Sequence, residues 1–207
     1  DTFFLAVISL NVGWVTLSTL TLFFSMLLRA IRWHLVTGLP RNNFLKVWDA
    51  SCIGYLGNAI YPARAGDVMR VFRLQQSTGM GGGLAIGSAL VDRILDGLAL
   101  CCPLLVVTLF WVGDLQAQQG FVWVVLVFLA ATVAGIFFVL GGHRLRSLFQ
   151  YLAAQWPVCV RINHWYEQSL SGLQILRSPR LILLVFVLQG VITFLDILAF
   201  WFLFQAF

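Results

Sequence analysis

Charged residues are scarce in this sequence. Only 10% of its 207 residues are Asp, Glu, Lys or Arg, whereas 60% are hydrophobic. Soluble domains carry about a quarter charged residues, so this composition excludes an ordinary soluble domain. The sequence therefore predicts an all-α integral membrane protein, a polytopic helical bundle that forms a single membrane domain over residues 1–207.

The motifs of familiar catalytic and metal sites are also missing. The cysteines Cys52, Cys101, Cys102 and Cys159 show no CxxC spacing, and the three histidines lie far apart without an HExxH pattern. The glycine-rich run at residues 78–83 lacks the GK[ST] ending of a P-loop. We therefore expect no cofactor and no metal, and an enzyme is the less favoured class.

Lysine is nearly absent, since Lys46 stands beside 12 arginines in a chain of net charge +5. The planar fork of arginine can hold a phosphate in two-point contacts, which suits anionic lipid headgroups, although arginine-rich cytoplasmic loops give the same composition. The basic residues lie at predicted membrane boundaries, so no nucleic acid is expected as a partner. Membrane lipids are the expected partners, and the oligomeric state, monomer or homo-oligomer, stays open.

Four apolar runs are long enough to cross a membrane, which takes about 20 helical residues. They are residues 3–28, 84–112, 121–140 and 181–207. Arg29, Arg32 and Trp33 follow the first run and mark its cytoplasmic end, which places the N-terminus outside. The expected location is the inner membrane of a bacterium.

Polar residues within these runs predict helix contacts. Small hydroxyl residues in the first run, among them Ser18 and Ser25, let helices approach closely and hydrogen-bond in lipid. In the last run Asp196 is a lone acid, which we expect to face the bundle and to pair with an arginine.

Residues 44–62 form an ambiguous element. They are apolar enough to enter the membrane but contain Lys46, Asp49, several glycines and Pro62. If they crossed, the arginines after Pro62 would lie outside and the later loops would invert. If they dipped in and returned, every basic residue outside the spans would face the cytoplasm, so the positive-inside tendency favours a re-entrant, broken segment.

Two segments, residues 67–76 and 143–178, are predicted to be interfacial amphipathic helices. In the first, the apolar residues are Val68, Val71, Phe72 and Leu74, while Arg70, Arg73 and Gln76 can point to water or headgroups. The second mixes arginines with aromatic residues, a composition that suits the headgroup region.

Charged residues inside the apolar runs mark the candidate site. Asp92 and Asp96 are four residues apart and share one helix face, with Arg93 beside them. The two acids repel unless a cation lies between them, and Arg64, Arg70 or Arg93 could be that cation. Such groups are costly in a membrane and need partners.

Two interpretations of these charges stay open. Either a polar cavity uses Arg64, Arg70 and Arg73 to hold a lipid phosphate while the acids orient them, or the charges form a structural network that ties the broken segment to the bundle. The candidates for the lipid path are Arg64, Asp67, Arg70, Arg73, Asp92, Arg93 and Asp96. The supporting residues are Gly57, Asn58, Pro62, Gly66 and Asp196.

A pattern of fixed spacing runs through this region. It consists of Gly57-Asn58, then Pro62-Ala63-Arg64-Ala65-Gly66-Asp67-Val68-Met69-Arg70, then Asp92-Arg93-Ile94-Leu95-Asp96, with Arg32-Trp33 after the first run. Over residues 29–100 the sequence resembles the flippase-like membrane domain of the lysylphosphatidylglycerol synthase transmembrane-region family.

The resemblance implies a polytopic domain that binds lipids and, in its best-understood members, moves an aminoacylated phospholipid between leaflets. Other members are linked to glycosyl carrier lipids or hopanoids. The resemblance also implies two re-entrant elements related by a repeat, of which this chain shows one, so we expect the C-terminal half of the domain to be missing. Synthase activity is not expected, because no aminoacyl-transferase domain follows Phe207 in this sequence.

The leading hypothesis is a protein that binds or translocates an anionic or aminoacylated phospholipid or a polyprenyl-phosphate lipid. One alternative is a membrane transferase that acts on a lipid carrier, with Asp92 or Asp96 as its base. The other is a structural membrane module whose charges serve assembly.

Overall fold

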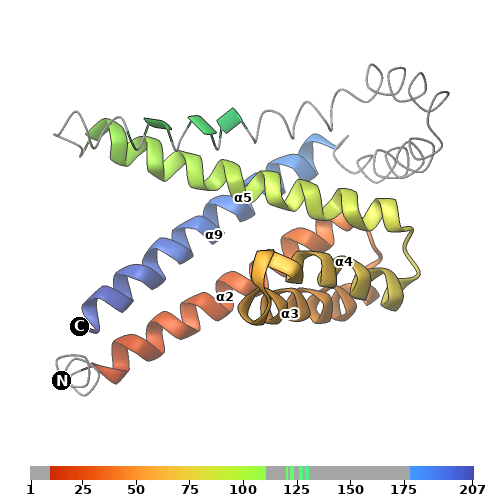
Figure 1. Cartoon of the computed structure of the whole chain (residues 1–207), viewed down its shortest axis with the longest axis horizontal. Coiled ribbons are helices and arrows are strands. Elements are labelled where there is room, and N and C mark those ends of the chain that lie inside the picture. Colours follow the sequence, from red (N-terminus) through yellow and green to blue (C-terminus); the bar gives the residue numbers. More distant parts are fainter. Residues whose placement is uncertain (1–9, 111–119, 121, 124–125, 128, 131–177) are drawn as a thin grey trace.

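A computed structural model describes residues 10–110, 120, 122–123, 126–127, 129–130 and 178–207 (Figure 1). The described residues form helices and no strand, which confirms the predicted all-α class. The helices are α2 (Val12–Thr37), α3 (Phe44–Ile60), α4 (Ala65–Thr78), α5 (Gly82–Phe110) and α9 (Pro179–Gln205), with the short 3-10 helices η1 (Arg41–Asn43) and η2 (Pro62–Arg64).

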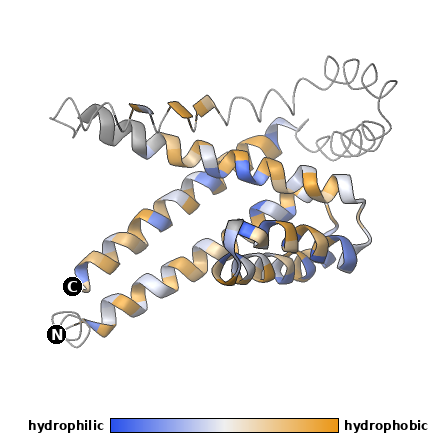
Figure 2. Cartoon of the chain, viewed as in Figure 1, coloured by the Kyte–Doolittle hydropathy of each residue, from blue (hydrophilic) through white to orange (hydrophobic). Residues whose placement is uncertain are grey.

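Helices α2 and α9 lie side by side and run in opposite directions (Figure 1). Near one end the backbone N–H of Asn11 donates to the carbonyl of Ala206 (3.1 Å). Further along, the hydroxyl of Ser18 donates to the carbonyl of Ala199 (2.8 Å), so the polar side predicted for the first run is a helix contact. By length and composition both helices could cross a membrane, and apolar residues predominate along α9 (Figure 2).

Helix α2 continues well beyond the predicted end of the first span at Leu28. It passes through Arg29 and Arg32 and ends at Thr37, where Gly38 adopts the left-handed conformation (φ 64°) that commonly closes a helix. The helix therefore does not end before the two arginines, and their position at a membrane interface stays a prediction. Arg32 is fully buried, because acids from α5 neutralise it inside the bundle. Residues 3–9 of the predicted span lie outside the described residues.

The other predicted runs are helical where the structure describes them. Residues 84–110 lie in α5, residues 111–112 lie outside the described residues, and most of residues 181–207 lie in α9. In the predicted span 121–140 the described residues are helical. The predicted amphipathic segment 143–178 lies outside the described residues except for Ser178, which precedes α9.

Helices α3 and α4 form an antiparallel hairpin (Figure 1). The chain does not break at the glycines of residues 44–62. It breaks at the end of that range, between Tyr61 and Arg64, where Pro62 begins the short η2 helix. The open end of the hairpin packs against the C-terminal part of α2 in one core cluster. The cluster consists of Trp33, Val47, Ala50 and Leu74, with Leu39 and Met80 against it.

Glycines bring the two helices of the hairpin into backbone contact. A Cβ added at Gly57 would lie 2.8 Å from the Cα of Gly66, and one added at Gly54 would lie 2.9 Å from the Cβ of Arg70. Both distances are too short for real side chains, so only glycine fits. Small residues serve the same purpose at helix contacts in membranes, and here they hold α4 close enough to place Arg70 beside α5.

The faces of α4 differ from the amphipathic prediction. Arg70 is buried (6% exposed), whereas Val68 and Phe72 are 57% and 60% exposed. Arg70 turns inward because it pairs with an acid on α5. Leu74 is buried and Arg73 is exposed, as an amphipathic helix requires, so the prediction is wrong at Arg70, Val68 and Phe72 but not along the whole of α4.

The directions of the helices agree with a re-entrant hairpin. Helix α5 is antiparallel to α2, since Arg29 contacts Asp96 while Trp33, one turn later in α2, donates to Ser88, two turns earlier in α5. A crossing α3 followed by an interfacial α4 would instead require α5 to run parallel to α2. The position of the hairpin in a membrane stays a prediction.

Cysteine labelling can test this topology in a variant that lacks the four native cysteines. We expect a cysteine at Arg73, which is 44% exposed, to react from the cytoplasmic side. A cysteine at Val12, which is 74% exposed at the other end of α2, should react from the outside. Reaction of both positions from the same side would contradict the re-entrant course.

Candidate functional site

The candidate site is built on an ion-pair network within the helix bundle. Asp92 of α5 is almost fully buried (3% exposed) and lies between two arginines. Arg32 Nη2 is 2.6 Å from Asp92 Oδ1, and Arg70 Nη1 is 3.0 Å from Asp92 Oδ2. The guanidinium of Arg70 also lies 4.7 Å from the centroid of the Trp33 ring, a cation–π contact. Each carboxylate oxygen of Asp92 thus has its own arginine.

Asp96, one turn further along α5, is held by three arginines. Its Oδ1 atom is 2.9 Å from Arg32 Nη2 and 3.2 Å from Arg29 Nη1. Its Oδ2 atom is 3.4 Å from Arg93 Nη1. The cation between Asp92 and Asp96 is therefore Arg32, and not one of the predicted candidates Arg64, Arg70 and Arg93. Of these two acids, Arg93 contacts Asp96 only.

Arg29 links α2 to both α5 and α9. Besides Asp96 it pairs with Asp196 of α9, whose other carboxylate oxygen accepts a hydrogen bond from the Ser25 hydroxyl. The expectation that Asp196 faces the bundle and pairs with an arginine is confirmed.

Asp67, in the first turn of α4, extends the network to the hairpin. It pairs with Arg93 of α5, and Arg70 Nε lies 3.8 Å from its Oδ1 atom. The Asn58 side chain donates to the same oxygen (3.4 Å), which ties α3 to the start of α4. Two residues of the predicted supporting set, Asn58 and Asp196, thus contact the network directly.

The charges of the network balance. Its arginines are Arg29, Arg32, Arg70 and Arg93, and its aspartates are Asp67, Asp92, Asp96 and Asp196. Removing ions from water costs several kcal/mol each, and only close pairing offsets that cost. Because the network contains equal numbers of arginines and aspartates, it leaves no net charge within the bundle.

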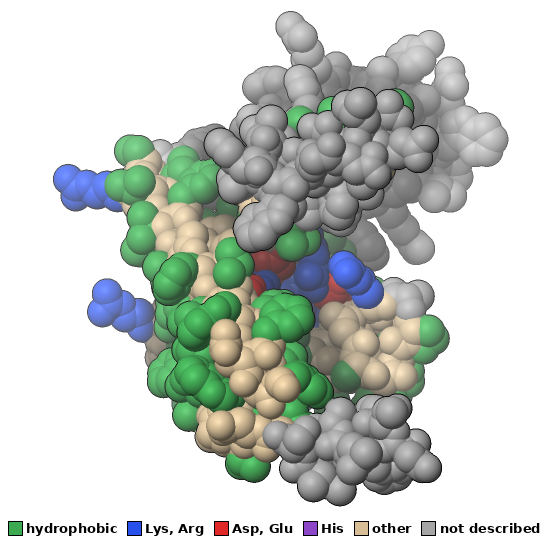
Figure 3. Space-filling model, turned by 90° about the vertical axis from the view of Figure 1, so that its left-hand side faces the viewer, with side chains coloured by type: hydrophobic (Ala, Val, Ile, Leu, Met, Phe, Trp, Pro, Cys, Tyr) green, Lys and Arg blue, Asp and Glu red, His purple; other side chains and the backbone are tan. Residues whose placement is uncertain are grey.

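A cavity of about 940 Å³ lies beside the network. Residues of α2, α5, α9 and the α3–α4 hairpin line it, some charged and others apolar, such as Leu22, Leu100 and Phe200. Figure 3 shows acidic and basic side chains in a recess of the surface, with hydrophobic side chains along one side of it. The cavity is within the range of about 300–1,000 Å³ for small-molecule sites and combines polar and apolar walls.

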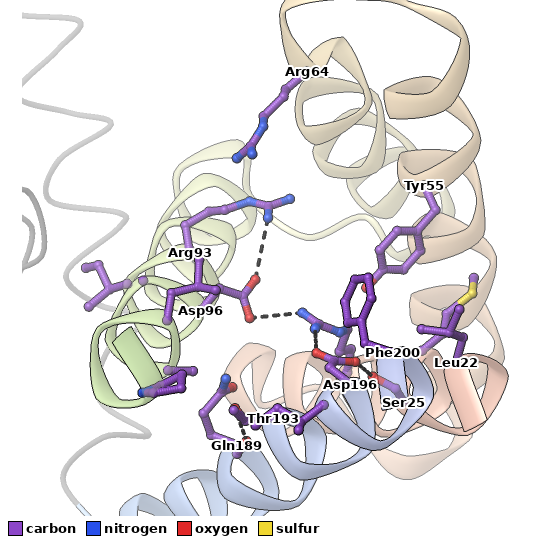
Figure 4. Close-up of a pocket in the computed structure, with 18 of the residues that line it drawn as sticks. Leu22, Ser25, Tyr55, Arg64, Arg93, Asp96, Gln189, Thr193, Asp196 and Phe200 are labelled. Atoms are coloured by element: carbon purple, nitrogen blue, oxygen red, sulfur yellow. Dashed lines mark hydrogen bonds and ion pairs between the residues drawn. The ribbon is translucent and has the colours of Figure 1, made fainter. Parts of the chain in front are cut away.

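Arg64 differs from the arginines of the network. It lines the cavity from the turn of the hairpin and has a left-handed backbone (φ 55°), a conformation uncommon for residues other than glycine. In the part of the chain that the structure describes, no acid pairs with it. Figure 4 shows its side chain extending from the hairpin toward the region of Arg93.

The predicted phosphate-holding arginines therefore do not lie together. Arg64 lines the cavity, whereas Arg70 is held beneath it by Asp92. Arg73 is not among the cavity-lining residues and forms a half-exposed pair with Asp49 (2.7 Å). Gly57, Pro62 and Gly66 shape the hairpin rather than line the cavity.

Sequence reasoning missed Arg29 and Arg32 as site residues. The signal lay in the spacing, because Ser18, Ser25, Arg29 and Arg32 recur at intervals of three, four and seven along one face of α2. The polar side predicted for the first run simply continues into the two arginines. Among the described residues, no group of three or more His, Cys, Asp or Glu side chains is placed to hold a metal ion.

An apolar helical bundle with its charges turned inward is the design of a helical integral membrane protein. The chain belongs to the lysylphosphatidylglycerol synthase TM region family, whose model matches residues 1–207. The resemblance seen in the sequence is thereby confirmed, and with it a lipid-related role in a membrane. Comparison with curated proteins and with solved structures finds no match.

Proposed function

We propose that this chain binds the headgroup of a membrane lipid in the cavity and moves the lipid between leaflets. The main support for this proposal is the composition of the cavity wall. Arg29, Arg64 and Arg93 make part of the wall charged, whereas residues such as Leu22 and Phe200 make another part apolar. A lipid has the same two parts, a polar headgroup and apolar chains. Translocation needs no covalent chemistry, only a polar path through an apolar bilayer.

The α3–α4 hairpin supports this proposal. Tyr55 of α3 and Arg64 of the turn both line the cavity. Interrupted helices that line a cavity near the middle of the membrane are a common feature of transporter binding sites. A hairpin that enters and returns would put its turn within the bilayer and beside the path.

The geometry gives less support to a transferase. A general base needs an oxygen that is free to take a proton from the substrate. Both carboxylate oxygens of Asp92 and both of Asp96 contact arginines. Either acid would have to give up an ion pair within the bundle before it could act as a base.

Filling the cavity tests the proposal. The purified chain in vesicles should accelerate the exchange of a labelled anionic phospholipid between leaflets. The variant Thr193→Trp, which places a large ring at a cavity-lining position of α9, should slow this exchange about tenfold or more, because the headgroup loses its space. The measurement is the rate at which a membrane-impermeant reductant quenches the label.

The matched control is Val187→Trp, since Val187 lies on the same helix but is 55% exposed on the outside of the described bundle. This variant should exchange lipid at the rate of the unsubstituted chain. Equal rates for vesicles with and without the protein would refute translocation. Equal slowing by both variants would show that the cavity is not the path.

A further inference from the structure

The geometry points to a cavity that selects lipids with a net negative, phosphate-centred headgroup and discriminates against headgroups with a free ammonium, such as aminoacylated phospholipids. This inference rests on the proposed function and names the substrate class of the same cavity. It follows from which charges in the cavity wall are already paired and which are not.

The acids have no capacity left for a cationic ligand. Among the residues that the structure describes, two acids line the cavity, Asp96 and Asp196. The oxygens of Asp96 contact Arg29, Arg32 and Arg93, and those of Asp196 contact Arg29 and Ser25. An ammonium group could reach a carboxylate only by displacing one of these arginines, which would then need a new partner.

The basic side chains do have spare capacity. Among the described residues, the cations with no ion pair to an acid are Arg41, Lys46, Arg64 and Arg180. Arg64 is the one of these four that lines the cavity. The charged lining residues that the structure describes are thus three arginines (Arg29, Arg64 and Arg93) and two aspartates (Asp96 and Asp196), a net charge of +1.

The spare hydrogen-bonding groups on the arginines are donors. Arg64 and Arg93 extend toward the same part of the cavity (Figure 4). The Nε atom of Arg93 is buried and has no hydrogen-bond partner in the described part of the chain. Phosphate oxygens are the acceptors that two guanidinium groups best hold together. A phosphate between Arg64 and Arg93 would also remove the repulsion between two like charges.

The opposite wall offers a neutral group. Gln189 of α9 lines the cavity, and its buried Oε1 atom accepts no hydrogen bond from any described residue. A neutral amide can hydrogen-bond to a hydroxyl of a headgroup, but it does not offset the full charge of an ammonium group. A monoanion would therefore neutralise the lining, whereas a cation would raise its net charge to +2 in surroundings of low dielectric constant.

Equilibrium binding to the full chain in a non-ionic detergent tests the inference. The probes are three short-chain lipids: dihexanoyl phosphatidylglycerol with net charge −1, its lysyl ester with net charge +1, and zwitterionic dihexanoyl phosphatidylcholine. We expect the anionic lipid to bind about ten- to a hundredfold more tightly than the lysyl ester, the range for hydrogen bonds that involve a charged group.

Variants at Arg64 assign the selectivity to one residue. Asparagine and aspartate tolerate the left-handed backbone at this position better than other side chains. Arg64→Asn should remove most of the preference for the anionic lipid, and Arg64→Asp should reverse it in favour of the lysyl ester. Arg41→Asn, which removes a cation outside the cavity, should leave the preference unchanged.

The outcomes separate this inference from the proposed function. Equal binding of all three lipids, or tighter binding of the lysyl ester to the unsubstituted chain, would overturn the charge selectivity and leave lipid binding intact. Binding of none of the three would overturn the proposed function itself. Inorganic phosphate that displaces the anionic lipid at equal concentration would identify a site for free phosphate and would also overturn the lipid proposal.

Discussion

Replacing Asp92 with asparagine is expected to lower the free energy of unfolding by about 3–5 kcal/mol, the range for removing one partner of a buried ion pair. The substitution keeps the shape of the side chain but removes the charge that holds Arg32 and Arg70. Arg32 has no exposed surface through which water could replace the lost carboxylate. The measurement is reversible unfolding in detergent micelles, followed by circular dichroism.

A matched control is Asp49→Asn, which breaks the pair between Asp49 and Arg73. That pair is close (2.7 Å), but both side chains are nearly half exposed, so its loss should cost less than about 1 kcal/mol. Equal losses for Asp49→Asn and Asp92→Asn would show that burial does not determine the strength of these pairs.

A double variant tests whether charge balance is the cause. Removing Arg70 together with Asp92, as Arg70→Gln and Asp92→Asn, leaves three arginines and three aspartates in the network. The double variant should be more stable than Asp92→Asn alone, because no arginine is left in excess. A loss equal to the sum of the two single losses would contradict a coupled network.

The sequence predicts the helical class, the apolar spans and the charged residues, but not how the charges pair. Asp196 could be assigned an arginine partner from sequence, because a lone acid in an apolar run has few other ways to be stable. The spacing puts Arg32 on the polar face of α2 but does not give its partners, since an arginine at the end of an apolar run usually lies at the interface. Only the approach of α5 to α2 turns Arg32 into the cation between Asp92 and Asp96.

The structural role of the glycines in residues 44–62 also could not be predicted from the sequence alone. A glycine in an apolar run indicates either a break in a helix or a close helix contact, and the sequence pattern is the same for both. The glycines therefore predict a broken helix over residues 44–62. In the structure Gly54 and Gly57 instead lie within the continuous helix α3, where they contact α4. The partner helix, which lies further along the chain, decides between the two.

The orientation of α4 could not be predicted for the same reason, because it depends on the position of a partner helix. A helix with alternating arginines and apolar residues is normally oriented with its charges toward water. Here Asp92 on α5 draws Arg70 inward, and Phe72 faces outward. The pairing of a charge across helices outweighs the orientation that hydropathy alone predicts.

The second large effect is expected at Gly66, where alanine should lower the free energy of unfolding by about 3 kcal/mol, the upper part of the usual range for overpacking. A Cβ at this position would overlap the backbone carbonyl oxygen of Gly54 and lie 2.5 Å from the backbone N of Asn58. Backbone atoms cannot move aside as a flexible side chain can, so α4 would have to shift away from α3.

That shift would also reach the ion-pair network and the cavity. Arg70 follows Gly66 by one helical turn, and its contact with Asp92 depends on the position of α4. Gly66→Ala should therefore slow lipid exchange as well as destabilise the fold. The control Gly190→Ala adds the same methyl group to α9, where a Cβ meets no atom of the described residues within 4 Å. This variant should leave both properties unchanged or slightly improve stability. A Gly66→Ala variant as stable as Gly190→Ala would show that the two helices of the hairpin do not need backbone contact.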